Sequence, residues 1–356
     1  MFFSRIIGQE KAKRFLENVM ARKRVPHAYL FTGISGIGKT SAAKAFSMRL
    51  NCSAPSGLDG CGVCPSCRKM LNGNFPDFIS IEPDGQRIKI EQIRELNRSL
   101  GYAPFSGGYR VCVIHRAEAM TGEAANAFLK TLEEPPAGNI FVLNATDPRD
   151  LLPTIVSRCQ RVSFMPLKAR EITEQLNKET DLDGSSVSIL ARAADGSLGR
   201  ALKMGESNYL ERRQTWLKTL FELYGCSGAE AMNMAVESAK ENRAGLDQPG
   251  NKKVGLFDML SVWATCYRDL LLVRAGAPKS LLINEDFLGQ LQETASRLSL
   301  QNLIESFQMV DRAVRDLYRM RNPTLVMENA LLNLQKMGLN LQKMGQIGRA
   351  SCRERV

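Results

Sequence analysis

The chain has 356 residues, of which 44% are hydrophobic and 24% charged, a composition that excludes a disordered or fibrous protein. At usual domain sizes this length predicts two or three domains. No apolar run approaches the roughly 20 residues of a membrane span, and the start lacks the order of a secretory signal. We therefore expect a cytoplasmic protein with no membrane partner. The formal net charge of +11 permits nucleic-acid binding without showing it.

Five short apolar runs bounded by turn residues predict strands in the first half of the chain. They are residues 28–32, 78–81, 111–114, 140–143 and 162–164. Near-continuous apolar strands separated by helical patterns indicate a buried, mostly parallel sheet. After Pro166 the strand signals cease and amphipathic helical patterns follow, with a loop expected at 241–253. The predicted fold class is α/β followed by all-α.

Residues 33–40, Gly-Ile-Ser-Gly-Ile-Gly-Lys-Thr, match the phosphate-binding pattern G-x-x-x-x-G-K-[ST] between a predicted strand and a predicted helix. Glycines let successive backbone N–H groups face the phosphates, and the helix N-terminus adds a partial positive charge. Lys39 would neutralise the β- and γ-phosphates, and Thr40 would hold Mg²⁺. The candidate nucleotide-binding residues are Gly33, Gly36, Gly38, Lys39, Thr40 and Ser41.

The acids that nucleotide hydrolysis requires are missing after the predicted strand 111–114. His115 and Arg116 follow it directly, where a hydrolysing site needs a carboxylate for Mg²⁺. Neutral imidazole is a poor Mg²⁺ ligand, and an arginine would repel the ion. Glu118 comes later in the chain and is expected to face elsewhere. The sequence thus predicts that ATP, with Mg²⁺, is bound but not hydrolysed by this chain alone.

Four of the nine cysteines cluster in a short Gly- and Pro-containing segment: Cys52, Cys61, Cys64 and Cys67. In a chain without a secretory signal this clustering indicates a metal site rather than a disulfide framework. Two-residue gaps let three thiolates converge, and Cys52 can complete a tetrahedral shell around Zn²⁺. With four protein ligands the zinc would be structural, holding a segment that has little apolar material of its own.

Near the end of the chain, residues 332–338 are repeated without change as residues 339–345. A perfect tandem repeat followed by a short basic segment indicates a sequencing or assembly scar, with a natural unstructured tail as the alternative. Residues 339–356 contribute +3 to the net charge, from four basic residues and one acid.

In this order the motifs resemble those of the clamp-loader subunits of bacterial DNA polymerase III, a branch of the AAA+ ATPases. Besides the phosphate loop and the four-cysteine insert, the matching segments are residues 7–9, 127–136, 145–148 and 152–159. The specific motifs cover residues 4–205, whereas 206–337 match by helical character and size. The resemblance implies an AAA+ domain at 1–166 with a zinc module at about 51–70, a helical lid at 167–207 and a helical collar at 208–337. Residues 338–356 would be the non-native tail.

In that family the segment Ser157-Arg158-Cys159 presents an arginine finger. The resemblance therefore implies that Arg158 acts in trans on the nucleotide of an adjacent subunit. Loss of the acids with retention of this segment is similar to the delta-prime type of subunit. Hydrolysing gamma/tau subunits also carry a sensor arginine where this chain has Gly199, with Arg200 one residue later.

The partners implied by the resemblance are gamma/tau and delta subunits in a hetero-pentameric ring, the sliding clamp, and primed DNA bound without sequence preference. The chain would be a component of the polymerase III holoenzyme, itself without ATPase or polymerase activity. Three other functions stay open. One is a gamma/tau-type ATPase subunit. Another is a small-molecule kinase with a phosphate loop and a zinc lid. The last is a nucleic-acid-binding zinc protein, which would make the match at residues 33–40 a coincidence.

Overall fold

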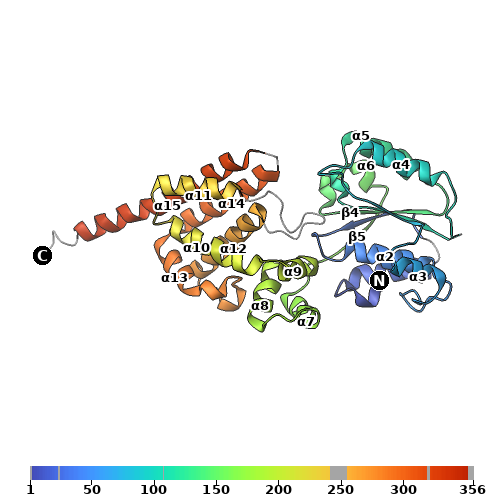
Figure 1. Ribbon diagram of the computed structural model, residues 1–356, viewed down its shortest axis with the longest axis horizontal. Coiled ribbons are helices and arrows are strands. Elements are labelled where there is room, and N and C mark those ends of the chain that lie inside the picture. Colours follow the sequence, from blue (N-terminus) through green and yellow to red (C-terminus); the bar gives the residue numbers. More distant parts are fainter. Residues whose placement is uncertain (1, 23–24, 107, 241–254, 319–320, 352–356) are drawn as a thin grey trace. The chain divides into compact units, whose positions relative to one another are not determined.

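The computed structural model describes residues 2–22, 25–106, 108–240, 255–318 and 321–351, and within the last two ranges it leaves out the side chains of 318 and 338–351. The chain divides into two compact units (Figure 1). Unit 1 comprises Met1–Ile172 and Asp195–Gly199, and unit 2 comprises Thr173–Ala194 and Arg200–Val356. The three-part division with boundaries near 166 and 207 stays a prediction.

Unit 1 is built on a five-stranded sheet in which every paired strand is parallel. The strands are β1 (Ala28–Thr32), β2 (Phe78–Ile81), β3 (Arg110–Ile114), β4 (Asn139–Ala145) and β5 (Gln160–Ser163). Their order across the sheet is β2-β3-β4-β1-β5, so β1 lies between β4 and β5. Because the strands are parallel, their carboxyl ends share one edge, and in such sheets ligands bind outside that edge.

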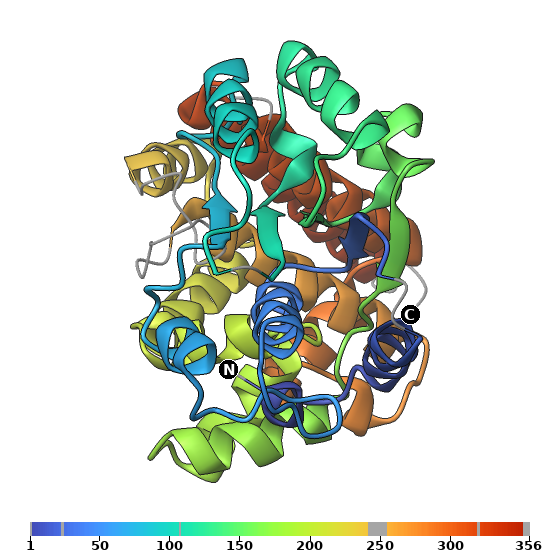
Figure 2. The same ribbon diagram turned by 90° about the vertical axis from the view of Figure 1, so that its right-hand side faces the viewer.

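Helices cover both faces of this sheet, which explains why its central strands are apolar on both sides. The helices of unit 1 are α1 (Glu10–Ala21), α2 (Lys39–Leu50), α3 (Pro65–Leu71), α4 (Ile90–Leu100), α5 (Gly122–Glu133) and α6 (Pro153–Val156). One apolar core joins β1, β3 and β4 to α4, α5 and α6, and a second joins the sheet to α1 and α2. Figures 1 and 2 show α4 and α5 on one face and α2 on the other.

The chain from residue 173 onward forms helices only, within the described ranges of unit 2. These are the larger part of α7 (Ala169–Glu179), α8 (Gly184–Ala193), most of α9 (Leu198–Gly205), α10 (Tyr209–Leu223), α11 (Gly228–Lys240), α12 (Leu256–Arg274), α13 (Leu288–Arg297), α14 (Leu300–Tyr318) and α15 (Pro323–Ser351). Helix α12 packs against α13 and α14, and α11 packs against α15. The indole of Trp263, fully buried in α12, donates to the carbonyl of Trp216 in α10 at 2.9 Å.

The α/β-then-helical fold class is confirmed, and each predicted strand is present within one or two residues of its expected bounds. The loop predicted at 241–253 lies outside the described residues. The backbone of α15 continues as a helix through both copies of the seven-residue repeat. The origin of residues 338–356 stays a prediction.

Candidate functional site

The phosphate loop begins where β1 ends, and its first residue has to be glycine. Gly33 has φ +141°, and a Cβ atom there would lie 2.6 Å from the carbonyl oxygen of Phe164. Its N–H donates to the carbonyls of Ala145 and Thr146 at 3.2 Å, which fixes the loop to the end of β4. Gly36 and Gly38 also have positive φ, +73° and +104°. Three of the predicted site residues are thus glycines because of the backbone they adopt.

The N–H groups of the loop are available to a ligand. Those of residues 34–38 donate to no acceptor within the described part of the chain. The loop carbonyls, in contrast, accept hydrogen bonds: Gly33 O and Ile34 O from Lys39 Nζ, Ser35 O from Ser197 Oγ, and Gly36 O from Gly199 N. Helix α2 begins at Lys39, with Thr40 and Ser41 in its first turn. This set of free N–H groups at a helix N-terminus fits the phosphates of a nucleotide.

Glu118 lies at the phosphate loop, and the expectation that it faces elsewhere is wrong. Burial lowers the pKa of Lys39 to about 8, and the negative charge of Glu118 partly opposes this shift. Thr146 Oγ1 donates to Glu118 Oε1 at 3.5 Å, while Oε2 is buried without a partner among the described residues. The physical reason is local. Arg116 adopts φ +49°, and the chain turns back there into a short 3₁₀ helix over residues 117–119.

The hydroxyl of Thr40 has nitrogen atoms of two side chains, His115 and Asn144, at hydrogen-bonding distance. His115 Nδ1 lies 3.3 Å from Thr40 Oγ1, and the side-chain amide of Asn144 donates to the same oxygen at 3.3 Å. The other ring nitrogen of His115 forms a hydrogen bond of 2.8 Å with Ser80 Oγ. Burial lowers the pKa of His115 below its ordinary value, so the ring is neutral at pH 7. Strands β2, β3 and β4 thus each bring one polar side chain to this edge of the sheet.

These residues fit a Mg²⁺ ion poorly. No carboxylate contacts Thr40 in the described ranges, and Mg²⁺ prefers oxygen ligands. Arg116, which takes the place of the second acid, is exposed.

The position of the sensor arginine is occupied by a backbone contact. A Cβ atom on Gly199 would lie 2.9 Å from the carbonyl oxygen of Gly36, so this conformation leaves no room for a side chain at that position. Arg200 makes an ion pair of 3.7 Å with Asp258 of α12.

Gln9, in the matching segment 7–9, connects the start of the chain to the segment after β5. Its side-chain amide forms two hydrogen bonds with the backbone of Met165, donating at 2.8 Å and accepting at 2.9 Å. A Cβ atom on the preceding Gly8 would lie 2.7 Å from Leu167. Residues 7–9 therefore attach the start of the chain to the segment that follows β5.

Arg158 follows the short helix α6 and is held by its own chain. One guanidinium nitrogen donates to Glu133 Oε1 at 2.7 Å, and another donates to the carbonyl of Thr154 at 2.9 Å. The Arg158 side chain is 36% exposed. No described contact joins it to the phosphate loop of the same chain.

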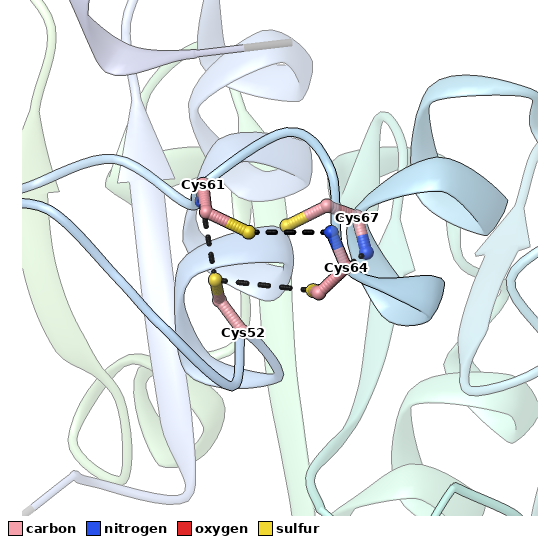
Figure 3. Close-up of side chains that lie close together, drawn as sticks. All are labelled: Cys52, Cys61, Cys64 and Cys67. Atoms are coloured by element: carbon pink, nitrogen blue, oxygen red, sulfur yellow. Dashed lines mark hydrogen bonds between the residues drawn. The ribbon is translucent and has the colours of Figure 1, made fainter.

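The four cysteines converge as predicted (Figure 3). Their sulfur atoms all lie within 4.8 Å of one another, and a tetrahedral ZnS₄ centre with Zn–S bonds of 2.3 Å requires S···S distances of roughly 3.8 Å. Cys52 follows the end of α2, and Cys64 precedes α3 as its N-cap. A Cβ atom on Gly60 would lie 2.9 Å from the sulfur of Cys67, so the segment packs closely around the cluster.

Hydrogen bonds favour the thiolate form of Cys61 and Cys64, whereas burial raises the pKa of Cys67 to about 12. Cys61 N donates to the sulfur of Cys52 at 3.1 Å, and Cys64 N donates to that of Cys61 at 3.3 Å. Hydrogen bonds from the backbone of Cys64 and Val63 lower the pKa of Cys61. Burial opposes the thiolate of Cys64, yet hydrogen bonds from Cys67 and other neighbours outweigh it and lower its pKa to about 6. The cluster fits Zn²⁺ in ligand type, number and spacing.

Three residues of these sites have no part in the sequence predictions: Ser80, Asn144 and Glu133. Asn144 carried a signal, because it is a polar residue directly after an apolar run and is 4% exposed at the end of a buried strand. Glu133 lies within the matching segment 127–136, which does not reveal its contact with Arg158, and Ser80 carried no signal, since serines at surfaces are ordinary.

None of the helices in the described ranges combines the length and the apolar character that crossing a membrane requires.

Comparisons with known proteins agree with the fold. A family model described as "DNA polymerase III, delta subunit" matches residues 8–168, and one described as "DNA polymerase III, delta subunit, C terminal" matches residues 208–336. The chain is 29% identical over 348 residues to DNA polymerase III subunit tau of Bacillus subtilis, which covers 92% of this chain and 60% of the relative. It is 40% identical over 207 residues to subunit tau of Salmonella typhimurium, covering 57% of this chain and 32% of that one.

The chain therefore spans less than two thirds of the length of these tau relatives. It is also 28% identical over 321 residues to subunit delta' of Bacillus subtilis, covering 90% of this chain and 94% of the relative. The two family models match in chain order and together cover most of the chain, and the delta' relative matches along nearly its whole length, so the chain belongs to the family of DNA polymerase III clamp-loader subunits.

Proposed function

We propose that this chain is a delta-prime-type clamp-loader subunit, which hydrolyses no ATP itself and supplies Arg158 to a neighbouring subunit. The observation that carries the proposal is the pairing of two features. His115 contacts Thr40 where a hydrolysing site requires a carboxylate, while Arg158 is present and partly exposed. The match to 94% of the length of a delta' subunit supports the same reading.

Arg158 is suited to acting outside its own chain. Its bonds to Glu133 and to the carbonyl of Thr154 fix the direction of the guanidinium. A positioned guanidinium stabilises the charge that develops on a transferring phosphoryl group, provided that it reaches the group at a neighbouring site.

In this proposal residues 1–166 form the nucleotide-binding domain, 167–207 a lid and 208–337 the collar. The collar would join the chain to gamma/tau and delta subunits in a ring of five in the cytoplasm. That ring would open the sliding clamp and place it on primed DNA, with the basic charge of the chain contributing salt-sensitive contacts to the DNA backbone. Zn²⁺ on the cysteine cluster would hold residues 51–70 in place.

The test is reconstitution with the tau and delta subunits of the same organism. The wild-type chain is expected to co-elute with them, and the complex should hydrolyse ATP in response to primed DNA and clamp. Arg158→Ala should co-elute equally well yet lower this hydrolysis. Arg161→Ala, an exposed arginine three residues further along, is the matched control. An Arg158→Ala complex with the wild-type rate would exclude the arginine-finger role.

A hydrolysing, gamma/tau-type subunit is the second candidate, favoured by the 40% identity to a tau subunit and by the carboxylate of Glu118 near Lys39. The pure chain distinguishes the two. ATP turnover by the isolated protein that disappears in Lys39→Ala would establish the second candidate, whereas the first predicts no turnover. The kinase alternative has no observation in its favour.

A further inference from the structure

The Thr40 hydroxyl has little capacity left for a metal ion. A hydroxyl has one proton and two lone pairs, and here two nitrogen groups, His115 Nδ1 and the Asn144 amide, lie at hydrogen-bonding distance from it. The hydrogen bond of 2.8 Å between Ser80 and the far side of the imidazole holds the ring in this position. The imidazole of His115 is therefore held against the Thr40 hydroxyl, which would be a ligand of any Mg²⁺ bound here.

The nearest acid does not replace the missing ligand. Glu118 Oε1 accepts a hydrogen bond from Thr146 Oγ1, and among the described residues the contacts of the Thr40 hydroxyl come from His115 and Asn144 instead. The carboxylate of Glu118 offsets the positive charge of Lys39. A carboxylate ligand of Mg²⁺ would have to share that ion with the hydroxyl of Thr40.

What remains in the site still favours phosphate. The free N–H groups of residues 34–38, the N-terminus of α2 and the amine of Lys39 all bring positive or partly positive charge. None of these groups needs a divalent cation to bind an anion.

We propose that this phosphate loop binds the polyphosphate chain of a nucleoside triphosphate without a divalent cation, because His115 and Asn144 occupy the hydroxyl of Thr40. The inference deepens the proposed function and rests on it, because a nucleotide held without a metal lacks the ion that hydrolysis requires. The bound nucleotide would serve to hold the loop and α2 in one conformation.

The experiment measures the affinity of the pure, zinc-loaded chain for a fluorescent ATP analogue in Mg²⁺-free buffer and in millimolar Mg²⁺. Zinc content is determined on the same samples, so that a loss of zinc is not mistaken for an effect of Mg²⁺. In millimolar Mg²⁺ almost all of the nucleotide is the Mg²⁺ complex, so a site that takes the metal-free polyphosphate should bind no more tightly with Mg²⁺ than without it, and its apparent dissociation constant should stay the same or rise. Lys39→Ala should abolish binding in both buffers, which assigns the signal to the loop.

His115→Asp is the decisive variant. An aspartate places hard oxygen ligands beside Thr40, so its affinity should rise about tenfold or more when Mg²⁺ is added. Glu118→Gln should gain no affinity from Mg²⁺, as the wild type gains none. The inference is overturned if the wild type binds at least about tenfold more tightly with Mg²⁺, or if it binds no nucleotide in either buffer. Neither outcome would count against the arginine-finger role of Arg158, because the reconstituted Arg158→Ala complex tests that role separately.

Discussion

Gly33 is the residue at which the sheet becomes the phosphate loop. The chain has to leave β1 next to the carbonyl of Phe164, which follows β5, and only a residue without a Cβ atom can pass at that distance. The N–H groups that would bind phosphate depend on this turn, since residue 33 sets the direction of the following loop.

Gly33→Ala is therefore expected to lower the free energy of unfolding of unit 1 by about 2 kcal/mol, because it adds a backbone clash to an unfavourable φ. Gly122→Ala is the control, since Gly122 begins α5 and a Cβ there would meet nothing within 4 Å. Its effect should stay within about 0.5 kcal/mol. Denaturant unfolding measures both. Equal stability of the two variants would contradict the role of Gly33.

Single residues also mark where prediction from sequence ended. Both His115 and Glu118 stand out in the sequence, but the sequence predicts the wrong direction for the side chain of Glu118. Their positions depend on Arg116 adopting φ +49°, a conformation that arginine rarely takes and that no local pattern announces. The contact between Glu133 and Arg158 joins residues 25 positions apart, which spacing alone does not reveal.

At the scale of elements, the segment that carries the cysteine cluster is expected to depend on a bound metal for rigidity. Around the cluster only a small apolar group is buried, formed by Met48, Cys67, Met70 and Phe75. Asp59 of the same segment accepts hydrogen bonds from the backbone N–H groups of Phe3 and Ser4, so the start of the chain is attached to it. Loss of the metal is expected to loosen both.

Cys64→Ser should therefore reduce bound zinc well below one equivalent per chain, measured by elemental analysis. The melting temperature should fall by roughly 5 °C or more, since a loss of a few kcal/mol shifts a unit of this size by several degrees. Cys226→Ser, a half-buried cysteine outside the cluster, should keep its zinc. A Cys64→Ser protein with full zinc content and unchanged melting would contradict the assignment.

Helix α8 should carry a pH dependence of its own. Asp183 accepts the N–H groups of Ser185 and Ser186 at 3.1 Å as the N-cap of this helix. Hydrogen bonds from these two serines hold the pKa of the carboxyl well below its usual range. Since the unfolded pKa is about 3.9, the stabilisation is complete above about pH 5 and is lost progressively as the pH falls toward the lower pKa of the folded state.

The difference in free energy of unfolding between wild type and Asp183→Ala should accordingly shrink as the pH falls from about 5 to about 2. Urea unfolding across this range measures it, and other titrating groups cancel in the difference. A difference that stays constant with pH would show that the charge of Asp183 does not stabilise the helix.

For the whole molecule, the sequence predicted the order of the elements well, because apolar runs of strand length between turn residues leave few alternatives. The five strands and the helical second half follow from that pattern. The strand order β2-β3-β4-β1-β5 does not, since it depends on long-range pairing that the sequence does not encode locally. The functional sites were found through motifs of fixed spacing, and side chains that complete them from other strands were not.

We propose that Arg158 acts on a nucleotide bound by another subunit, so the test of this role has to use the assembled complex. The most direct measurement is a single-turnover assay of ATP hydrolysis in the complex with primed DNA and clamp, at saturating ATP. Removal of a group that stabilises the transition state lowers the rate at the site it serves by about 10²-fold or more.

We predict that the Arg158→Ala complex loses hydrolysis at one ATP site. Its assembly and its ATP binding should match the assembly and ATP binding of the Arg161→Ala control. Hydrolysis at every site at the wild-type rate in a fully assembled Arg158→Ala complex would contradict this prediction.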